Sequence, residues 1–445
     1  MARVGSRIGN EDYENQDVNV EGELMERPED SVETQLIEVD NETRDADVLD
    51  IDADQLDSDT AQLERHADNV AASLEDGGMD ETAARATEIA VEDITNRWNL
   101  TTRRLGTENF ASGTGRLQAT RLGLESIMDS ISSAWERFLD WMRERFQAMK
   151  DVWRKYVNAG KSFKKRAQKL RERVNKLSGS PDTDDKVSMK KIWMLACGEK
   201  VDPKDVTGFS EKTFDAGAHA IEMSFEATEK TWTSTGALTN SIVPTEKLIP
   251  AGFKFNLNGS ESKFNKMLPA GIDRSNGSKV KINAVPGALF FMYKKTAQTG
   301  DRFKGVEGFD AFAGQDNLLY AQLKLEDVLD QEAPVLTPDQ MHEYLDTVIG
   351  LASGFEKFIQ KYSSVERRMT KLEGELKRAI EKEGKAGGDT AAKQAKMKET
   401  SLKVEICKVN LNNAIQIDRM VQGTARNVCQ GSLIYVTESM RFYKD

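Results

Sequence analysis

Apolar side chains recur at helical spacing through much of the chain. Over residues 116–157 they return every three or four positions, which predicts one strong amphipathic helix. The apolar positions of this helix are Leu117, Leu124, Ile127, Ile131, Trp135, Phe138, Met142, Phe146, Met149, Trp153 and Tyr156. The Asn-Ala-Gly sequence at 158–160 is expected to end it, and a second helix is predicted from about residue 161 to about residue 177.

A still longer helix is predicted from Thr337 onward. Thr337 is a good N-cap, Pro338 suits the first helical position, and Gln340 completes a capping box. The apolar side chains that follow repeat about every 3.5 residues as far as Ile380, which favours coiled-coil packing along roughly 65–70 Å of helix. Glycines within residues 384–388 interrupt this pattern. Two more helices are predicted beyond them, over about 390–411 and about 414–443.

The middle of the chain, residues 186–330, has more glycine and threonine and shorter alternating patterns. Asn276-Gly277 is a strong signal for a β-hairpin turn. The strand candidates are residues 279–283, 288–294 and 318–325. We therefore expect a small, mainly antiparallel α+β unit in this part of the chain.

The beginning of the chain is dominated by acidic, amide and small side chains. Such a segment buries too little apolar area to offset its ordering entropy, so residues 1–58 are predicted to be disordered. A weak helical pattern follows from Ser58 to about Asn99, and Gly77-Gly78 divides it into two helices. These helices are expected to form a hairpin that folds onto the rest of the chain or onto a partner.

Together these patterns predict an α+β fold that is mainly helical. Long amphipathic and coiled-coil helices surround a small antiparallel α+β domain, and the acidic N-terminus is disordered. The predicted regions are an acidic segment at 1–108, a basic helical region at 109–180, the α+β domain at 181–335, and a long helical hairpin with a C-terminal helix at 336–445.

Charge divides the chain more sharply than the apolar pattern does. Residues 1–108 hold 30 acidic and 9 basic side chains, whereas residues 109–445 hold 44 acidic and 53 basic ones. The change falls at Leu105-Gly106-Thr107-Glu108-Asn109-Phe110, a stretch followed by the small, flexible residues that a protease can bind extended. This junction is interpreted either as a processing site that frees an acidic propeptide or as an ordinary linker between helices.

A basic stretch follows the junction. Residues 150–179 contain eleven Lys and Arg against two acidic residues. The candidate contacts for nucleic acid, which we call the basic row, are Lys161, Lys164, Lys165, Arg166, Lys169, Arg171, Arg173 and Lys176. Three interpretations stay open: non-specific contact with the DNA backbone, a helix on a membrane surface, or the solvated face of a packed helix.

The sequence offers no residues for a reaction. His66, His219 and His342 lie in separate regions, no phosphate-binding, dinucleotide or hydrolase motif occurs, and a Cys197–His219 nucleophile pair is discounted because Cys197 follows an apolar run. We expect no enzyme, no cofactor and no metal. The three cysteines predict free thiols, and no signal peptide or membrane span is expected, so the protein should be soluble and intracellular or carried inside a particle assembled in a cell.

Several stretches taken together resemble one known family. They are the acidic front ending at 106–108, the sequence of residues 116–127 that leads into Trp- and Lys-rich helices, the Leu336-Thr337-Pro338 helix start, and the C-terminal residues 432–443. In these features the chain resembles the internal head proteins, or prohead core proteins, of large tailed bacteriophages.

The resemblance implies that a head-maturation protease cuts after a glutamate and removes the acidic front as a propeptide. In such families the residue two positions before that glutamate is often Ala or Ser, whereas here it is Gly106. Ala86-Thr87-Glu88 and Ala90-Val91-Glu92 fit the pattern better but fall inside a predicted helix. We therefore predict the cut between Glu108 and Asn109.

The resemblance also implies partners and a location. The basic remainder would stay inside the capsid beside genomic DNA, with capsid or scaffold proteins as partners, self-association through coiled coils, and the host cytoplasm as the place of assembly. Three other hypotheses remain: a scaffold or core protein lost from the mature head, a host-directed effector ejected with the DNA, and a cytosolic coiled-coil adaptor with an acidic tail.

Overall fold

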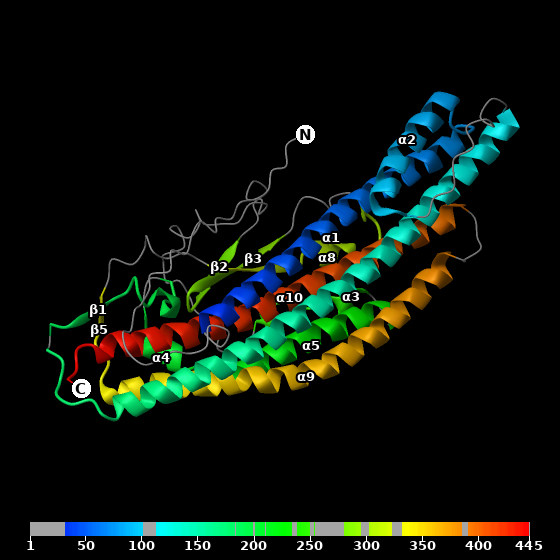
Figure 1. Ribbon diagram of the computed structural model, residues 1–445. Helices are drawn as coiled ribbons and strands as arrows, with labels where there is room; N and C mark the ends of the chain where they lie inside the picture. Colours follow the sequence, from blue (N-terminus) through cyan, green and yellow to red (C-terminus); the bar gives the residue numbers. More distant parts are fainter. Residues whose placement is uncertain are drawn as a thin grey trace.

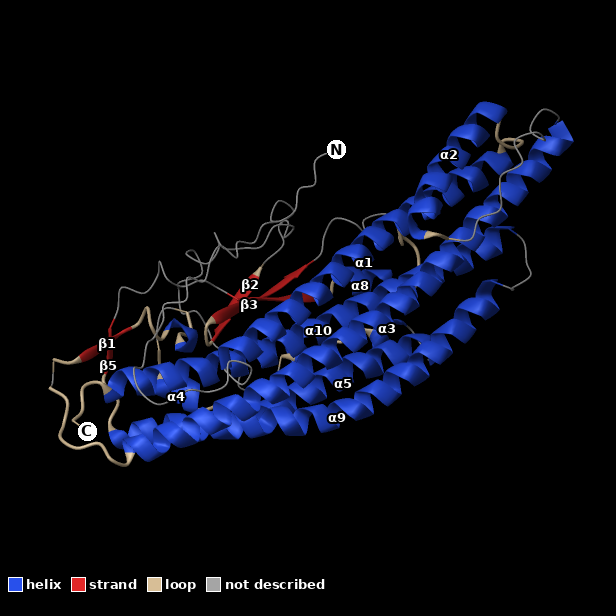
Figure 2. Cartoon of the chain, viewed as in Figure 1, coloured by secondary structure: helices blue, strands red, loops and turns tan. Residues whose placement is uncertain are grey.

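The protein is a mainly helical, elongated bundle with a small antiparallel sheet on one flank, as predicted (Figures 1 and 2). The computed structural model describes residues 32–100, 113–182, 184–198, 201–209, 211–233, 238–249, 253, 280–294, 302–322, 332–384 and 390–444. The long helices are α1 (Val32–Glu75), α3 (Gly113–Val174), α5 (Glu211–Thr233), α9 (Pro338–Gly384) and α10 (Thr390–Met440). All five run along the length of the bundle (Figure 1).

The shorter elements lie at the ends and flank of the bundle (Figure 2). The helices are α2 (Glu81–Trp98), α4 (Pro203–Thr207), α6 (Thr245–Leu248) and α8 (Phe309–Ala313), with 3-10 helices η3 (Trp193–Leu195) and η4 (Leu238–Ser241). The strands are β1 (Lys186–Ser188), β2 (Lys281–Val285), β3 (Ala288–Lys294), β4 (Asp316–Gln322) and β5 (Glu332–Pro334).

Helix α1 corrects the prediction for the acidic front. Residues 32–58 are helical, so the expected disorder is wrong for them, and residues 1–31 lie outside the described part. The buried face of α1 consists of Leu36, Val39, Ala53, Leu56, Asp59, Thr60, Leu63, Glu64, Ala67 and Val70. Many of these side chains are small or polar and lie between aspartates, so local composition hides a helix that packing against α3 stabilises.

The predicted hairpin of α1 and α2 is confirmed. Gly77 and Gly78, with φ of 92° and 94°, form the turn between the two helices. Asp80 caps α2 by accepting a hydrogen bond from the backbone N of Ala83 at 2.7 Å.

Helix α3 is continuous over 62 residues, so the predicted helix end at 158–160 is wrong. A Cβ atom on Gly160 would lie 3.1 Å from the carbonyl oxygen of Ala352 and 3.1 Å from Cδ2 of Phe355. Glycine at this position therefore permits the close approach of α3 and α9, and it does not end the helix.

Helix α9 begins as predicted. The Thr337 backbone N donates to Oε1 of Gln340 at 2.9 Å, and the Gln340 backbone N donates to Oγ1 of Thr337 at 3.3 Å, which is the reciprocal capping box. The helix packs against α3, α5 and α10. Its coiled-coil character stays a prediction.

Helix α10 is one helix of 51 residues, so the predicted division between 411 and 414 is wrong. Its polar side chains in this stretch face the edge of the sheet. Asn413 Oδ1 accepts from the backbone N of Leu318 at 2.9 Å, and Gln416 Oε1 accepts from that of Tyr320 at 3.0 Å. These amides interrupt the apolar pattern because they bind strand β4. Local sequence rules cannot detect such a long-range contact and therefore predict a break in the helix.

The flanking sheet has the strand order β2-β3-β4, with antiparallel neighbours. Its first turn lies at Pro286-Gly287, where Gly287 has a φ of 69°. The turn predicted at Asn276-Gly277 lies outside the described residues. Strands β1 and β5 form a separate antiparallel pair.

One apolar core joins the helices to the sheet. Trp153 of α3 is fully buried at its centre and stacks on Phe358 of α9, with 4.0 Å between the ring centroids. The indole Nε1 of Trp153 donates to Oδ1 of Asp418 at 2.6 Å, so this buried donor is satisfied.

Candidate functional site

Acidic side chains follow one side of α1 in two rows. The helix carries 14 acidic residues against 2 basic ones. The first row is Asp40, Asp47, Asp54 and Asp68, and the second is Asp50, Asp57 and Glu64. Members of a row are separated by seven residues or a multiple of seven, and a step of seven returns a side chain to nearly the same face of a helix.

Helix α10 supplies cations to these rows in the reverse order, so α1 and α10 run antiparallel. The N–O distances are Asp68 to Lys398 3.0 Å, Asp57 to Lys408 3.4 Å, Asp54 to Lys408 3.1 Å, Asp50 to Arg419 3.2 Å and Asp40 to Arg426 2.5 Å. Asp47 also pairs with Arg419. Helix α10 thus neutralises acidic side chains along most of the length of α1.

Helix α3 meets the same acids from the other side. Arg145, whose side chain is 2% exposed, binds Asp50 through Nε at 2.7 Å and through Nη2 at 3.2 Å. Burial raises the pKa of Asp50, while the guanidinium groups of Arg145 and Arg419 oppose that rise. Nearer the beginning of α1, Lys155 pairs with Glu38 at 2.9 Å.

Arg302 completes the set from the segment before α8. Its Nε lies 2.6 Å from Glu64 Oε2, and its Nη1 lies 3.1 Å from Asp57 Oδ1. Burial alone would lower the pKa of Arg302, but the carboxylates of Glu64 and Asp57 outweigh it and raise the pKa. The same balance raises the pKa of Lys408, where Asp57 makes the largest opposing contribution.

We call this set of contacts the charged interface. It comprises the α1 acids named above together with Glu38, and the cations Arg145, Lys155, Arg302, Lys398, Lys408, Arg419 and Arg426. The charged interface was not predicted from the sequence. The signal that could have revealed it is the seven-residue spacing of acids in α1, matched by cations spread over residues 398–426.

A buried carboxylate joins α2 to α1. Asp59, which is 1% exposed, accepts from Arg97 Nη1 at 2.8 Å and from Trp98 Nε1 at 2.8 Å. Because Arg97 and Trp98 form the last turn of α2, the two helices of the hairpin are fixed to each other at this point.

The predicted DNA contacts lie at the C-terminal end of α3 and just beyond it. Lys161, Lys164, Lys165, Arg171, Arg173 and Lys176 are exposed, whereas Arg166 and Lys169 are half-buried. Arg171 pairs with Asp346 of α9 at 2.8 Å. The ion pairs described between α1 and α3 end at Lys155, before this basic row begins. The acids of α1 and the basic row are therefore separate features of the surface.

The predicted cut between Glu108 and Asn109 lies outside the described residues, between the end of α2 and the start of α3. The two better-matching tripeptides, 86–88 and 90–92, lie within helix α2. A protease that binds its substrate extended would have to unwind α2 to reach them.

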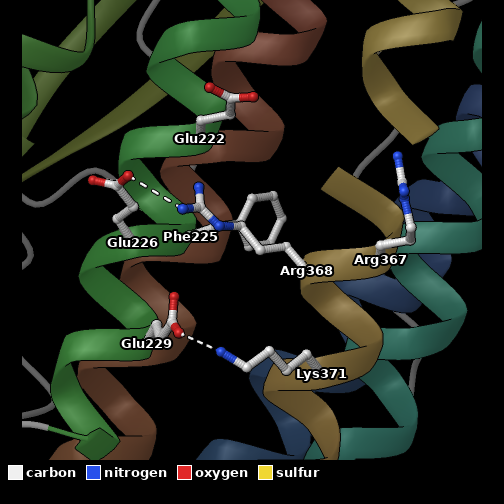
Figure 3. A pocket seen from close by; sticks show the side chains of 7 residues that line it. All are labelled: Glu222, Phe225, Glu226, Glu229, Arg367, Arg368 and Lys371. Atoms are coloured by element: carbon white, nitrogen blue, oxygen red, sulfur yellow. Dashed lines mark hydrogen bonds and ion pairs between the residues drawn. The ribbon is translucent and has the colours of Figure 1, made fainter. Parts of the chain in front are cut away.

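A groove of about 630 Å³ lies between α5 and α9 (Figure 3). Figure 3 shows Arg368 and Lys371 of α9 reaching across to Glu226 and Glu229 of α5, at 3.3 Å and 3.0 Å. These pairs neutralise the groove, and Phe225 contributes an aromatic ring to its lining. We assign no ligand to it.

The described residues contain no group of three or more side chains arranged to hold a metal ion. The three histidines lie on α1, α5 and α9. Cys197, Cys407 and Cys429 are free thiols, and burial raises the pKa of Cys407 to about 12. Within the same part of the chain, no helix has both the length and the apolar character to cross a membrane.

Comparison with known proteins gives the class. A family model of bacteriophage internal head proteins matches residues 41–404, from within α1 to within α10. The chain belongs to the phiKZ-like phage internal head proteins, which are structural proteins of the capsid interior. The charged interface, the junction and the basic row all lie largely or wholly within the matched residues. No curated protein and no solved structure matches the chain.

Proposed function

We propose that this protein is a non-catalytic component of the phage head that is cut between its acidic front and its basic body and then lies beside the genome. The observation that carries the proposal is the coincidence of three boundaries. The net charge changes sign near residue 108, helix α2 ends at Trp98, and helix α3 begins at Gly113. A cut at Glu108–Asn109 would fall between helices α2 and α3 and would separate the acidic part of the chain from the basic part.

The basic row supports a position next to DNA. Its exposed lysines and arginines lie on one end of α3, while Phe163, Ala167 and Leu170 of the same segment are buried. Such a row can replace counterions along a phosphate backbone without reading bases, because base recognition needs side chains placed in a groove. The contact would be non-specific and weakened by salt.

Partners follow from the same proposal. A head-maturation protease would make the cut, capsid or scaffold proteins would guide assembly in the host cytoplasm, and the long helices would provide surfaces for self-association. Membrane binding by the tryptophans of α3 is disfavoured, because Trp135, Trp141 and Trp153 are all at most 5% exposed.

The test is the intact mass and N-terminal sequence of this protein from mature particles. We expect a chain that starts at Asn109. A start at Ile89 or Asp93 would keep the processing and move the site into α2. A chain that is still uncut from Met1 or Ala2 to residue 445 would overturn the processing, and absence of the body from mature heads would favour a scaffold that leaves the particle.

A further inference from the structure

We infer that cutting the junction does not release the acidic segment. The bundle surface under α1 is a binding site for an acidic amphipathic helix, and residues 32–98 remain its occupant as a separate chain. This inference rests on the cut proposed above and adds a second product: a body that keeps its former front docked by non-covalent contacts.

The apolar contacts of α1 give the first reason. Leu36, Val39, Leu56, Leu63 and Val70 are each at most 5% exposed. They belong to the same continuous core as α3, α9 and α10. A cut between α2 and α3 removes none of these contacts, and separation of the pieces would expose all of them to water.

Burial at the charged interface gives the second reason. Arg145 and Lys408 have side chains that are 2% and 3% exposed, and Arg302 is 12% exposed. If α1 left, these cations would lose carboxylates that lie within 2.6–3.4 Å. Because α1 itself helps to cover these cations, its departure would also return them to water, so the ion pairs chiefly determine which helix fits the site and in which register it docks.

Helices α1 and α2 are joined to each other, so they would leave the bundle, or stay on it, as one unit. Asp59 fixes α2 to α1 through Arg97 and Trp98. The turn of the hairpin is in turn held to α3, since the backbone N of Met79 donates to Thr120 Oγ1 at 3.0 Å. The segment is therefore attached along its length, and its covalent connection through residues 101–112 is one link among many.

The experiment uses the full chain with residues 105–110 replaced by the recognition sequence of a site-specific protease. After complete cutting, confirmed by denaturing mass spectrometry, we expect both pieces in one size-exclusion peak at micromolar concentration and about 0.15 M salt. Two separate peaks would overturn the inference. If the folded chain resists the protease, pieces 1–104 and 105–445 are co-expressed with a tag on the larger, and failure of the smaller to co-purify has the same meaning.

A pair of variants tests whether the charged interface holds the segment. Asp50→Arg in the cleavable chain places a cation against Arg145 and Arg419, and we expect the dissociation constant of the cut segment to rise at least tenfold, or about 1.4 kcal/mol. Asp45→Arg changes the same charge at an exposed position of α1 and is expected to alter it less than twofold. Equal effects of the two variants would contradict the assigned contacts.

Because the engineered cut does not depend on the phage protease, this inference and the proposed processing fail separately. In mature particles, the inference predicts the mass of residues 1–108, or a trimmed form of it, beside that of residues 109–445. An uncut chain there would overturn the processing alone. A body without its acidic segment would overturn retention.

Discussion

Helix α1 and the basic row at the end of α3 are both helical stretches dominated by one sign of charge, but the bundle treats them differently. The acids of α1 meet cations from α3, α10 and the segment around Arg302. Six of the eight side chains of the basic row are exposed, and Arg171 has its pair at the surface. Composition alone assigns both to solvent. The difference shows that the position of the opposite charges decides whether a charged helix is part of the core structure or part of the outer surface.

The largest expected difference between the regions concerns stability. Arg145→Met leaves Asp50 half-buried with one cation fewer, and we expect the free energy of unfolding to fall by about 3 kcal/mol. Arg171→Met removes the exposed pair with Asp346 and should cost less than about 0.5 kcal/mol. Denaturant unfolding of both variants measures the contrast, and equal losses would break the comparison.

A pH dependence is expected next to the charged interface. Burial raises the pKa of Asp418 to about 7, against the hydrogen bond from Trp153 and the charges of Arg145 and Arg419. An acid whose pKa is raised on folding holds its proton more tightly in the folded state, so its contribution to stability falls as pH rises from about 4 to about 7. Between pH 5 and pH 8, the free energy of unfolding of the wild type should fall by about 2 kcal/mol more than that of Asp418→Asn. Parallel pH profiles of the two proteins would refute this.

DNA binding sharpens the comparison from the side of the basic row. We expect Lys164→Gln, Lys165→Gln and Arg173→Gln together to weaken binding about tenfold and to reduce the slope of log affinity against log salt by about 2 to 3. Lys398→Gln also removes a cation, but one paired with Asp68 in the charged interface, and it should leave the slope unchanged. Fluorescence anisotropy with one duplex at several salt concentrations distinguishes these outcomes.

The smallest effect is expected at the exposed end of the charged interface. Glu38 and Lys155 have side chains 42% and 34% exposed, so Glu38→Gln should change the unfolding free energy by less than about 0.5 kcal/mol. If Glu38→Gln lowered the unfolding free energy as much as Arg145→Met, solvent exposure would not determine how much each ion pair contributes to stability.

Local rules predicted the features that depend on neighbouring residues. The capping box of Thr337 and Gln340, the hairpin turn at Gly77-Gly78 and strand β3 all follow from short-range geometry. Long-range contacts explain the errors. The glycine at 160 predicts a helix end by local rules. Its actual role is to let Ala352 approach closely, and those rules cannot detect a contact with a residue almost two hundred positions away. The helical state of residues 32–58 of α1 is missed by local rules because the cations that pair with its aspartates lie on other helices.

The candidate site shows the same division. The basic row is visible in the sequence, since consecutive turns of one helix display it, and its contact with DNA stays a prediction. The charged interface was not predicted, because its cations come from three segments that only the fold brings together. Complementary spacing in α1 and α10 is a weaker signal than a motif, and it has meaning only once the two helices are known to be antiparallel.

The amide side chains of α10 at the sheet also affect whether two copies of the chain can pair through their sheets. Strand β4 is an edge strand, and an open edge can pair with the edge of another molecule. Asn413 and Gln416 occupy the backbone N–H groups of Leu318 and Tyr320 that such a pairing would use. The described edge of β4 is thus closed by its own chain, which disfavours strand addition by a second copy.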